Sequence, residues 1–339
     1  MKLKYKPFIY WSIIGVLAFT NVNASDHQKL AQTGFQFLSV ISDARGSAMA
    51  EAMTSLQVGS SAMFFNPAGM ANMTHFIDLS ASQNKWIADI NHNAFSLALS
   101  PASGKYGVFG LSLQTVDYGD FYGTVVDKDS PLGYKDTEIF QLNSLALGIA
   151  YAKQVSDRFS VGGQVRRVRQ DLGESVIPAV VRNDSILTTR EVSNELTPLA
   201  FDFGTQFRTD FKSLVFGMSV RNFSKEIKYA EEGFQLPLVF NLGISMNLMD
   251  FIKSAPFEQS LYLSIDASHY RDHPEQVKVG LDYRLLDVLS LRGGYASNDY
   301  ESAFSFGFGV SHFGLTFDYS YTPFGVFDYV QRMTARFAM

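Results

Sequence analysis

Residues 303–312, AFSFGFGVSH, decide the fold. Phe304, Phe306 and Phe308 alternate there with Ser305, Gly307 and Gly309. Successive side chains of a β-strand point to opposite faces, so this pattern predicts a strand with one apolar face and one face of small polar residues. A strand of this kind separates two different solvents.

The same two-residue period continues along the chain from residue 76. Segments 236–248, 261–268 and 314–321 each place an apolar stripe opposite Ser, Gly, Asn, Asp or Thr. We expect fourteen strands, at 76–83, 91–100, 104–116, 137–153, 158–170, 197–208, 211–222, 235–248, 258–269, 275–285, 288–297, 301–312, 314–322 and 330–338.

The composition excludes several classes of protein. The chain of 339 residues is 46% hydrophobic and only 18% charged, with 30 Phe, 16 Tyr and no Cys. A charged content below the usual value of about 25% argues against disorder and against nucleic-acid binding through a basic surface. Without cysteine there is no disulfide scaffold, thiolate metal site or cysteine nucleophile. Beyond residue 20 no apolar run reaches the roughly 20 residues of a membrane-spanning helix.

The N-terminus reads as an export signal over residues 1–24. Lys2, Lys4 and Lys6 precede an apolar stretch at 8–19, and VNA at 22–24 suits cleavage before Ser25. The alternative is an uncleaved anchor helix. The body of the protein is therefore expected outside the cytoplasm.

The connections between the expected strands alternate in length. Segments 117–136, 171–196 and 223–234 are long, whereas 101–103 and 156–157 are tight. Short periplasmic turns and long external loops are typical of outer-membrane barrels. We therefore predict an all-β membrane protein, a 14-stranded antiparallel transmembrane β-barrel over residues 76–339, in the bacterial outer membrane. A secreted β-sandwich would explain the alternation but not the rhythm of the loops.

Residues 25–75 lack the two-residue period. Apolar residues from Ala48 to Leu56 recur at helical spacing and predict a short amphipathic helix. Asn66 followed by Pro67 predicts a second helix start, where Gly69 allows close packing. A fourteen-strand barrel is too wide for its own side chains to fill. We thus expect 25–75 to form a short helical hatch or plug; the alternative is a periplasmic appendage.

Two runs in this segment, FLSVISDARGSAMAEA at 37–52 and FNPAGMA at 65–71, resemble the N-terminal signature of the PorV/PorQ family of FadL-like outer-membrane barrels. The resemblance implies a hatched fourteen-strand barrel associated with type IX protein secretion, and the FadL branch passes hydrophobic molecules. In motif it covers only about 35 residues. The hatch residues it identifies are Asp43, Ala44, Arg45, Gly46, Met49, Asn66, Pro67, Ala68 and Gly69.

Alternation also places charged residues on the inner face. They are Arg166, Asp202, Arg208, Arg221, Asp266, Lys278, Asp282, Arg292, Asp318, Arg332 and Arg336. Both signs occur, which favours a paired network between hatch and wall over an ion pathway, because a pathway needs a ring of one sign. His269 and His273 have a spacing that a metal tolerates but no third ligand, so we expect neither metal nor cofactor.

The residues show no nucleophile elbow, and we predict that the protein is not an enzyme. The leading hypothesis is a binding and relay component of protein secretion, which engages cargo or translocon through external loops 117–136 and 171–196. The alternative is a hatch-gated transporter of hydrophobic or small molecules. The expected partners are outer-membrane lipid, a secretion translocon or secreted cargo, or a hydrophobic ligand; nucleic acid is not among them.

Overall fold

The computed structural model describes residues 33–127, 130–182, 185–229, 232–252, 257–299, 302–327 and 329–339. The predicted signal at 1–24 and the first part of the predicted hatch, 25–32, lie outside the described residues.

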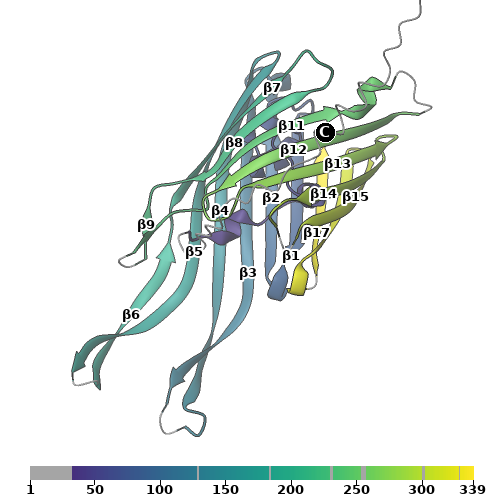
Figure 1. Ribbon diagram of the computed structural model, residues 1–339. Helices are drawn as coiled ribbons and strands as arrows, with labels where there is room; N and C mark the ends of the chain where they lie inside the picture. The colour runs from purple at the N-terminus through teal and green to yellow at the C-terminus, as the bar shows by residue number, and fades with distance from the viewer. Residues whose placement is uncertain are drawn as a thin grey trace, which may run out of the picture.

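The described strands form a closed antiparallel barrel (Figure 1). One sheet holds fifteen of them; β6 pairs only with β5, and the other fourteen form a ring closed by the β1–β17 and β4–β5 pairings. The strands are β1 Ile77–Lys85, β2 Asn91–Leu99, β3 Val108–Val126, β4 Tyr134–Ser156, β5 Phe159–Arg182, β6 Ser185–Leu196, β7 Leu199–Arg208, β8 Val215–Phe223, β11 Val239–Asn247, β12 Gln259–Tyr270, β13 Gln276–Leu285, β14 Leu289–Ala296, β15 Phe304–His312, β16 Leu315–Pro323 and β17 Tyr329–Ala338. A short ribbon pairs β9 Ile227–Lys228 with β10 Gly233–Phe234. Each of the fourteen predicted segments overlaps one ring strand, so the predicted barrel is confirmed.

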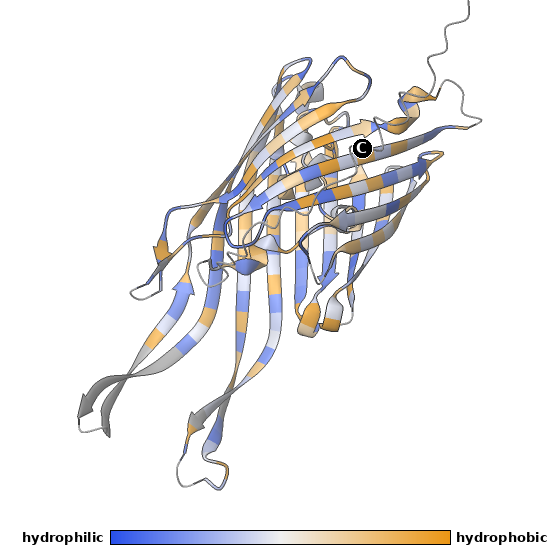
Figure 2. Ribbon diagram, in the orientation of Figure 1, coloured by the Kyte–Doolittle hydropathy of each residue, from blue (hydrophilic) through white to orange (hydrophobic). Residues whose placement is uncertain are grey.

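The two faces of each strand meet different surroundings. On β15, Phe306 is 55% exposed and its neighbour Ser305 only 2%; on β16, Phe317 is 65% exposed and Asp318 only 7%. Figure 2 shows this as bands of alternating hydropathy along the ribbons. The apolar stripes form the outer surface of the barrel and the small polar stripes face its interior, as lipid outside and a polar lumen inside require.

The expected external loops at 117–136 and 171–196 are not irregular loops. β3 with β4, and β5 with β6, continue there as two-stranded ribbons that project well past the other strands (Figure 1). β6 prolongs β7 across the break at Thr197 and Pro198, where the carbonyl of Pro198 accepts a hydrogen bond from the Val168 amide at 2.9 Å.

A β-bulge at the base of each ribbon explains why the sequence pattern predicted loops where the strands continue. The register slips between Asp117 and Asp120 and between Asp171 and Glu174. In each bulge a glycine, Gly119 or Gly173, has a φ of 76°, and its amide donates to the aspartate carboxylate two residues earlier, at 2.9 and 3.0 Å. A bulge inserts one residue and shifts the alternation out of phase, so the two-residue period stops there although the strand does not.

The N-terminal segment forms the predicted plug, but its helices differ from the prediction. The elements are η2 Gln36–Ser39, α2 Ala44–Ala48, η3 Gly59–Phe64 and η4 Pro67–Met70; the remaining short 3₁₀ turns are η5 Ile87–Asp89, η6 Pro101–Gly104, η7 Leu248–Phe251 and η8 Gly325–Phe327. The helix expected over 48–56 is wrong. Ala50 and Glu51 have φ values of 49° and 64°, and the Glu51 amide donates back to the Gly46 carbonyl at 2.8 Å, which turns the chain out of the helix.

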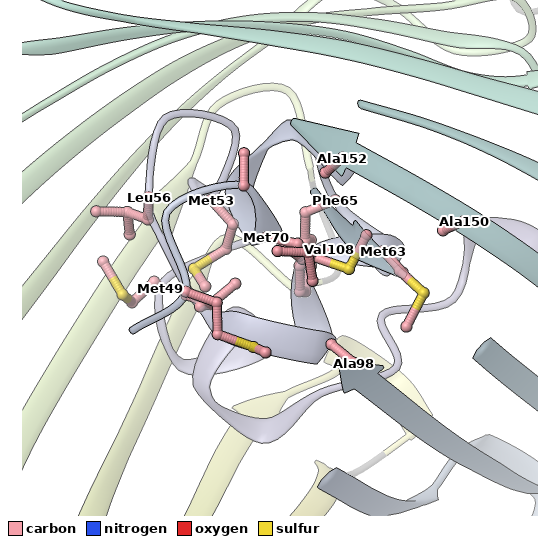
Figure 3. Packing of buried hydrophobic residues seen from close by; sticks show 14 residues of the cluster. Met49, Met53, Leu56, Met63, Phe65, Met70, Ala98, Val108, Ala150 and Ala152 are labelled. Atoms are coloured by element: carbon pink, nitrogen blue, oxygen red, sulfur yellow. The ribbon is translucent and has the colours of Figure 1, made fainter. Parts of the chain in front are cut away.

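Packing explains the helical spacing of the apolar residues. Met49, Met53 and Leu56 are buried together although no helix joins them. Figure 3 shows them beside further plug residues and beside inward wall residues, namely Met63, Phe65, Met70, Ala98, Val108, Ala150 and Ala152. The plug therefore brings its own apolar core into the barrel. Among the described residues, no helix combines the length and the apolar character that crossing a membrane demands.

The outward assignment of the aromatic stripe predicts a position-dependent cost of charge. Phe308→Arg at the middle of β15 is expected to destabilise the barrel by about 2–4 kcal/mol, because the guanidinium enters hydrocarbon. Phe313→Arg, in the turn after β15 where Phe313 is 88% exposed, is expected to cost about 0–1 kcal/mol near the interface. Urea unfolding in lipid vesicles measures both; equal losses would contradict the assignment.

Candidate functional site

The two motif runs of the plug fold against each other. Asp43 caps α2 by accepting a hydrogen bond from the Gly46 amide at 2.7 Å. Gly46 lies against the ring of Phe65, where an added Cβ would come within 2.3 Å. Ala44, on α2, is fully buried, and its amide donates to Thr334 of β17 at 2.8 Å. The first run thereby contacts both the second run and the barrel wall.

Asn66 fastens the second run. Its Oδ1 accepts from the Ala68 amide at 3.1 Å and Pro67 occupies the first position of η4, which confirms the predicted helix start as a 3₁₀ turn. Its Nδ2 donates to the carbonyls of Thr54 and Thr205, at 2.7 and 3.1 Å. One amide side chain thus bonds its own turn, the rest of the plug and strand β7. Gly69 lies against the Leu56 carbonyl, 2.9 Å from an added Cβ, so the close packing predicted there is present.

Inward-facing glycines of the wall hold the plug at backbone distance. A Cβ added to any of seven strand glycines would lie at most 2.8 Å from an atom of the plug. These are Gly110, Gly162, Gly204, Gly217, Gly280, Gly294 and Gly307. Sequence reasoning treated such residues as part of a generally polar wall and missed this role, although glycine at inward positions of several strands is a visible signal.

Arg45 joins the plug to a chain of charges on the wall. Its guanidinium lies 3.0 Å from Asp282 of β13, and Asp282 also pairs with Arg292 of β14 at 3.1 Å. Arg292 reaches Asp318 of β16 at 2.6 Å, and Arg284 adds a further pair to Asp282 at 3.1 Å. Buried charges are stable when they are paired and hydrogen-bonded, so the plug contributes one link to a network of residues from three strands and α2.

A second network forms around Glu51, which sequence reasoning missed because Glu51 lies outside the segments with a two-residue period. Its carboxylate accepts from Arg221 of β8 at 2.6 Å and from Lys278 of β13, and the Tyr270 hydroxyl donates to it at 3.4 Å. Burial raises the pKa of Glu51, but the charges of Lys278 and Arg221 outweigh this effect and hold the pKa at about 2. The plug carboxylate is thus ionised and shared between two cations on separate strands.

The other predicted inward charges fall into local pairs. Arg166 pairs with Asp202 at 2.8 Å, Asp266 accepts from the Thr54 amide of the plug at 2.9 Å, and Arg336 pairs with Asp78. Asp78 was missed, although it shares the polar face of β1 with Ser80 and Ser82 and alternation is a signal for it.

Arg208 and Arg332 differ from these pairs. Arg208 lies half-buried at the end of β7 next to the tight turns. Arg332 is buried without a carboxylate within 4.0 Å among the described residues.

The histidines of the β12–β13 connection bond to neighbouring acids. His269 contacts Glu275 at 3.2 Å on the surface, and His273 contacts Asp272 at 2.8 Å. Asp272 also accepts from Thr33 and Gln36, at 2.6 and 2.8 Å, so it holds the start of the described plug to this loop. Burial raises the pKa of Asp272, but the hydrogen bonds from His273, Thr33 and Gln36 outweigh it and keep the pKa well below its usual range.

A cavity of about 830 Å³ opens at the end of the barrel where the ribbons project. Its floor includes the plug residues Val40, Ile41 and Glu51, and its wall includes Trp86 and Arg332. Because the long connections of outer-membrane barrels are external, this is the extracellular end. The plug therefore separates an outer vestibule from the periplasmic side.

The closed ring, the apolar outer surface, the polar wall and the bonded plug define the class: this is a plugged outer-membrane β-barrel. Residues 133–324, more than half of the chain, match the family model described as type IX secretion system membrane protein PorP/SprF. The chain belongs to this family. A search of curated protein sequences found no match.

Solved structures with similar folds are FadL-like barrels. The Ralstonia pickettii toluene transporter TbuX aligns with a TM-score of 0.56 at 12% identity over 87% of this chain and 97% of that one. The Pseudomonas putida toluene transporter TodX gives 0.55 at 12% over 87% and 98%, and a Pseudomonas aeruginosa FadL homologue gives 0.51 at 13% over 88% and 98%. At these identities the likeness shows the fold. The findings support the coarser part of the predicted resemblance, a FadL-like barrel of a type IX secretion family, but they do not confirm PorV/PorQ itself. The matching model is that of PorP/SprF, and its match lies outside the N-terminal motif.

Gly162 and Gly163 give a matched test of how the plug is held. A Cβ on Gly162 would lie 2.5 Å from backbone atoms of Pro67 and Ala68, whereas on Gly163 its nearest contact is at 3.6 Å. Gly162→Val is expected to displace η4, lower stability by about 1–3 kcal/mol and raise conductance in planar bilayers. Gly163→Val is expected to change neither quantity. Identical traces for the two variants would contradict the close seating of the plug.

Removing the Glu51 carboxylate should loosen the second network. Glu51→Gln leaves Arg221 and Lys278 buried without their shared anion, and breaking a buried pair costs about 3–5 kcal/mol. The urea midpoint in vesicles is the measurement. Glu275→Gln, which alters an exposed contact with His269, is the control and is expected to leave the midpoint unchanged; an equally small shift for Glu51→Gln would show that the network does not stabilise the plug.

Proposed function

We propose that this protein is a non-catalytic binding component of type IX secretion, which engages secreted cargo or the translocon through its two extracellular ribbons. The observation that carries the proposal is the pair of projecting ribbons, β3–β4 and β5–β6. Membership of a secretion family supports the pathway, and the ribbons supply the surface.

The β3–β4 ribbon carries apolar side chains away from lipid. Beyond the bulge at Gly119, Phe121 stacks on Phe140 with their ring centroids 5.6 Å apart, and Tyr122 is paired with Ile139 across the ribbon. Tyr122 is 75% exposed and Ile139 54%. β3 continues for about 20 Å past the bulge at roughly 3.3 Å per residue. Exposed apolar residues on a projecting element are typical of protein-binding surfaces.

The backbone of the ribbon offers a second means of binding. β2 pairs with β3 only as far as Asp117, so the outer part of β3 has no neighbour on that side among the described strands. A free strand edge accepts an extended segment of another chain through main-chain hydrogen bonds. The aromatic side chains then give selectivity to a contact whose affinity comes from the backbone.

The interior supports binding without turnover. The charges that join plug to wall are used in ion pairs and hydrogen bonds, as at Arg45 and Glu51. A plug held by two networks and by close glycine contacts favours a stably closed barrel. This supports a role of the outer surface rather than of a reaction in the lumen.

The second candidate is a transporter of small hydrophobic molecules. It is favoured by the vestibule of about 830 Å³ above the plug and by the similar folds of two toluene transporters and a monoaromatic hydrocarbon channel. Under this proposal the plug moves to let the molecule pass.

Shortening one ribbon tests the binding role. Residues 121–140 are replaced by Asn-Gly, so that Asp120 and Gln141, which are already paired, are joined by a two-residue turn. Affinity capture from native outer membrane is expected to lose the partner that the wild type recovers, because the binding surface is gone while the ring persists. The control places Asn-Gly at Leu286 and Asp287, a turn at the other end of the barrel with φ values of 53° and 50°, and is expected to retain the partner.

The opposite outcome is equally informative. Unchanged partner recovery by the shortened protein would contradict the ribbon as the binding surface. If liposomes carrying the wild-type protein also took up toluene faster than protein-free liposomes, the transporter would become the better account.

A further inference from the structure

One buried cation in the barrel differs from the others. Arg332 of β17 is 2% exposed, and among the described residues no carboxylate lies within ion-pair distance of it. The other buried cations of the interior each have an acidic partner: Arg45, Arg166, Arg221, Lys278 and Arg292.

The guanidinium of Arg332 is only partly satisfied. Its Nη1 donates to the hydroxyls of Ser47 and Thr322, at 2.7 and 3.3 Å. Its Nε is buried and has no hydrogen-bond partner. The ring of Trp86 packs against the guanidinium of Arg332, whose carbon lies 5.4 Å from the ring centroid. A cation–π contact stabilises a desolvated charge by about 2 kcal/mol, but it supplies no acceptor for Nε.

Unsatisfied polar atoms also flank Arg332 on both neighbouring strands. Asn84 of β1 and Ser320 of β16 are its partners in register. Asn84 Oδ1 and Ser320 Oγ are both buried without a hydrogen-bond partner. Buried polar groups are nearly always paired. Of these three atoms, Arg332 Nε and Ser320 Oγ can donate hydrogen bonds to an anion, whereas Asn84 Oδ1 can only accept one.

The charges around Arg332 leave its positive charge uncompensated. Glu51 is the carboxylate that acts on it electrostatically, but Glu51 is bonded to Arg221 and Lys278. His92, whose ring lies 6.2 Å from that of Trp86, brings no negative charge. An anion entering here therefore meets a cation that has no competing partner.

The site is open to the outside. Arg332 and Trp86 line the vestibule, together with the apolar residues Ile41, Ile90 and Phe324. Trp86 and Phe324 pack edge to face, with their ring centroids 4.9 Å apart, and form an aromatic wall beside the cation. A positive group next to an apolar wall matches a small molecule with one carboxylate and an apolar body.

We propose that the vestibule binds a small organic carboxylate from the extracellular side, with the carboxylate on Arg332 and the apolar body against Trp86 and Phe324. The carboxylate supplies the negative charge that the chain does not, and it accepts hydrogen bonds from the guanidinium in the strong charge-assisted form. This site goes beyond the proposed role in secretion and does not depend on it, since no residue of the ribbons takes part.

Tryptophan fluorescence reads the site directly. The chain has two tryptophans, Trp11 and Trp86, and Trp11 lies in the predicted signal, so Trp86 reports alone in the exported protein; Trp11→Phe secures this. The probe is cyclohexanecarboxylate, which does not absorb with tryptophan. Cyclohexylmethanol and cyclohexylmethylammonium have nearly the same shape without the negative charge. The purified protein in detergent is expected to respond saturably to the carboxylate and more weakly to the other two.

Two arginine variants test the assignment. Arg332→Gln is expected to weaken carboxylate binding at least about tenfold, as loss of a charged hydrogen-bond donor implies, and to abolish the preference over the alcohol. Arg208→Gln, the same change at an inward arginine that does not line the vestibule, is expected to bind as the wild type does. Arg332→Lys, which keeps the charge, is expected to retain part of the preference.

Folding of each variant is checked by heat-dependent mobility on denaturing gels, and Arg332→Lys keeps the test available if Arg332→Gln does not fold. Equal responses of the wild type to carboxylate and alcohol, or unchanged carboxylate binding in a folded Arg332→Gln variant, would overturn the proposal. Loss of partner capture by the ribbon variant would not affect it, so the two proposals fail separately.

Discussion

Backbone hydrogen bonding in hydrocarbon is the constraint on which the rest of this structure depends. A lipid-facing strand has no water to bond its amides and carbonyls, so each strand needs a partner on both sides within the bilayer. Here the first and last strands provide the closure, with β1 and β17 paired from Asp78 opposite Ala338 to Lys85 opposite Gln331. Closure with fourteen strands has a second consequence, because a ring of that size encloses more space than wall side chains fill. In this barrel the plug occupies that space.

Residues of the plug and of the wall fill this space together. An apolar plug alone would leave Arg221 and Lys278 of the wall buried without the carboxylate of Glu51, with which both of them pair. Arg45 and Glu51 form ion pairs with Asp282 and Lys278, and so bond the plug to β13 at two points. Glycine on the wall brings the two backbones close enough for such bonds to form, as at Gly294, where an added Cβ would lie 2.3 Å from the Ala50 amide. Polar contacts position the plug, while Met49 and its neighbours supply apolar burial.

Alternation predicted the strands because it reports the two solvents of a single strand, and it needs no knowledge of the neighbours. It also identified the inward charges, including Asp282 and Arg292. What it did not contain was register, which decides that these two residues pair with each other. The sequence pattern did not predict the ribbons for a related reason, since the bulges at Gly119 and Gly173 shift the two-residue alternation by one residue. The repeated Asp-x-Gly at 117–119 and 171–173 was the available signal. The prediction of a helix at 48–56 was wrong because Met49 and Met53 are buried inside the barrel without a helical backbone between them.

Arg332 is a buried cation of the barrel interior that has no acidic partner among the described residues. Elsewhere in the lumen an uncompensated cation would attract the plug or a wall carboxylate, and the pairs at Asp282 and Asp202 show that this happens wherever an acid is within reach. Arg332 lies where the plug offers only the hydroxyl of Ser47 and where the adjacent strands offer the neutral Asn84 and Ser320. Under the proposal made above, a carboxylate ligand reaches this guanidinium from the vestibule that Arg332 lines. Under the two proposals, the extracellular end of the barrel carries two independent surfaces: the ribbons for a macromolecular partner, and the pocket beneath them for a small anion.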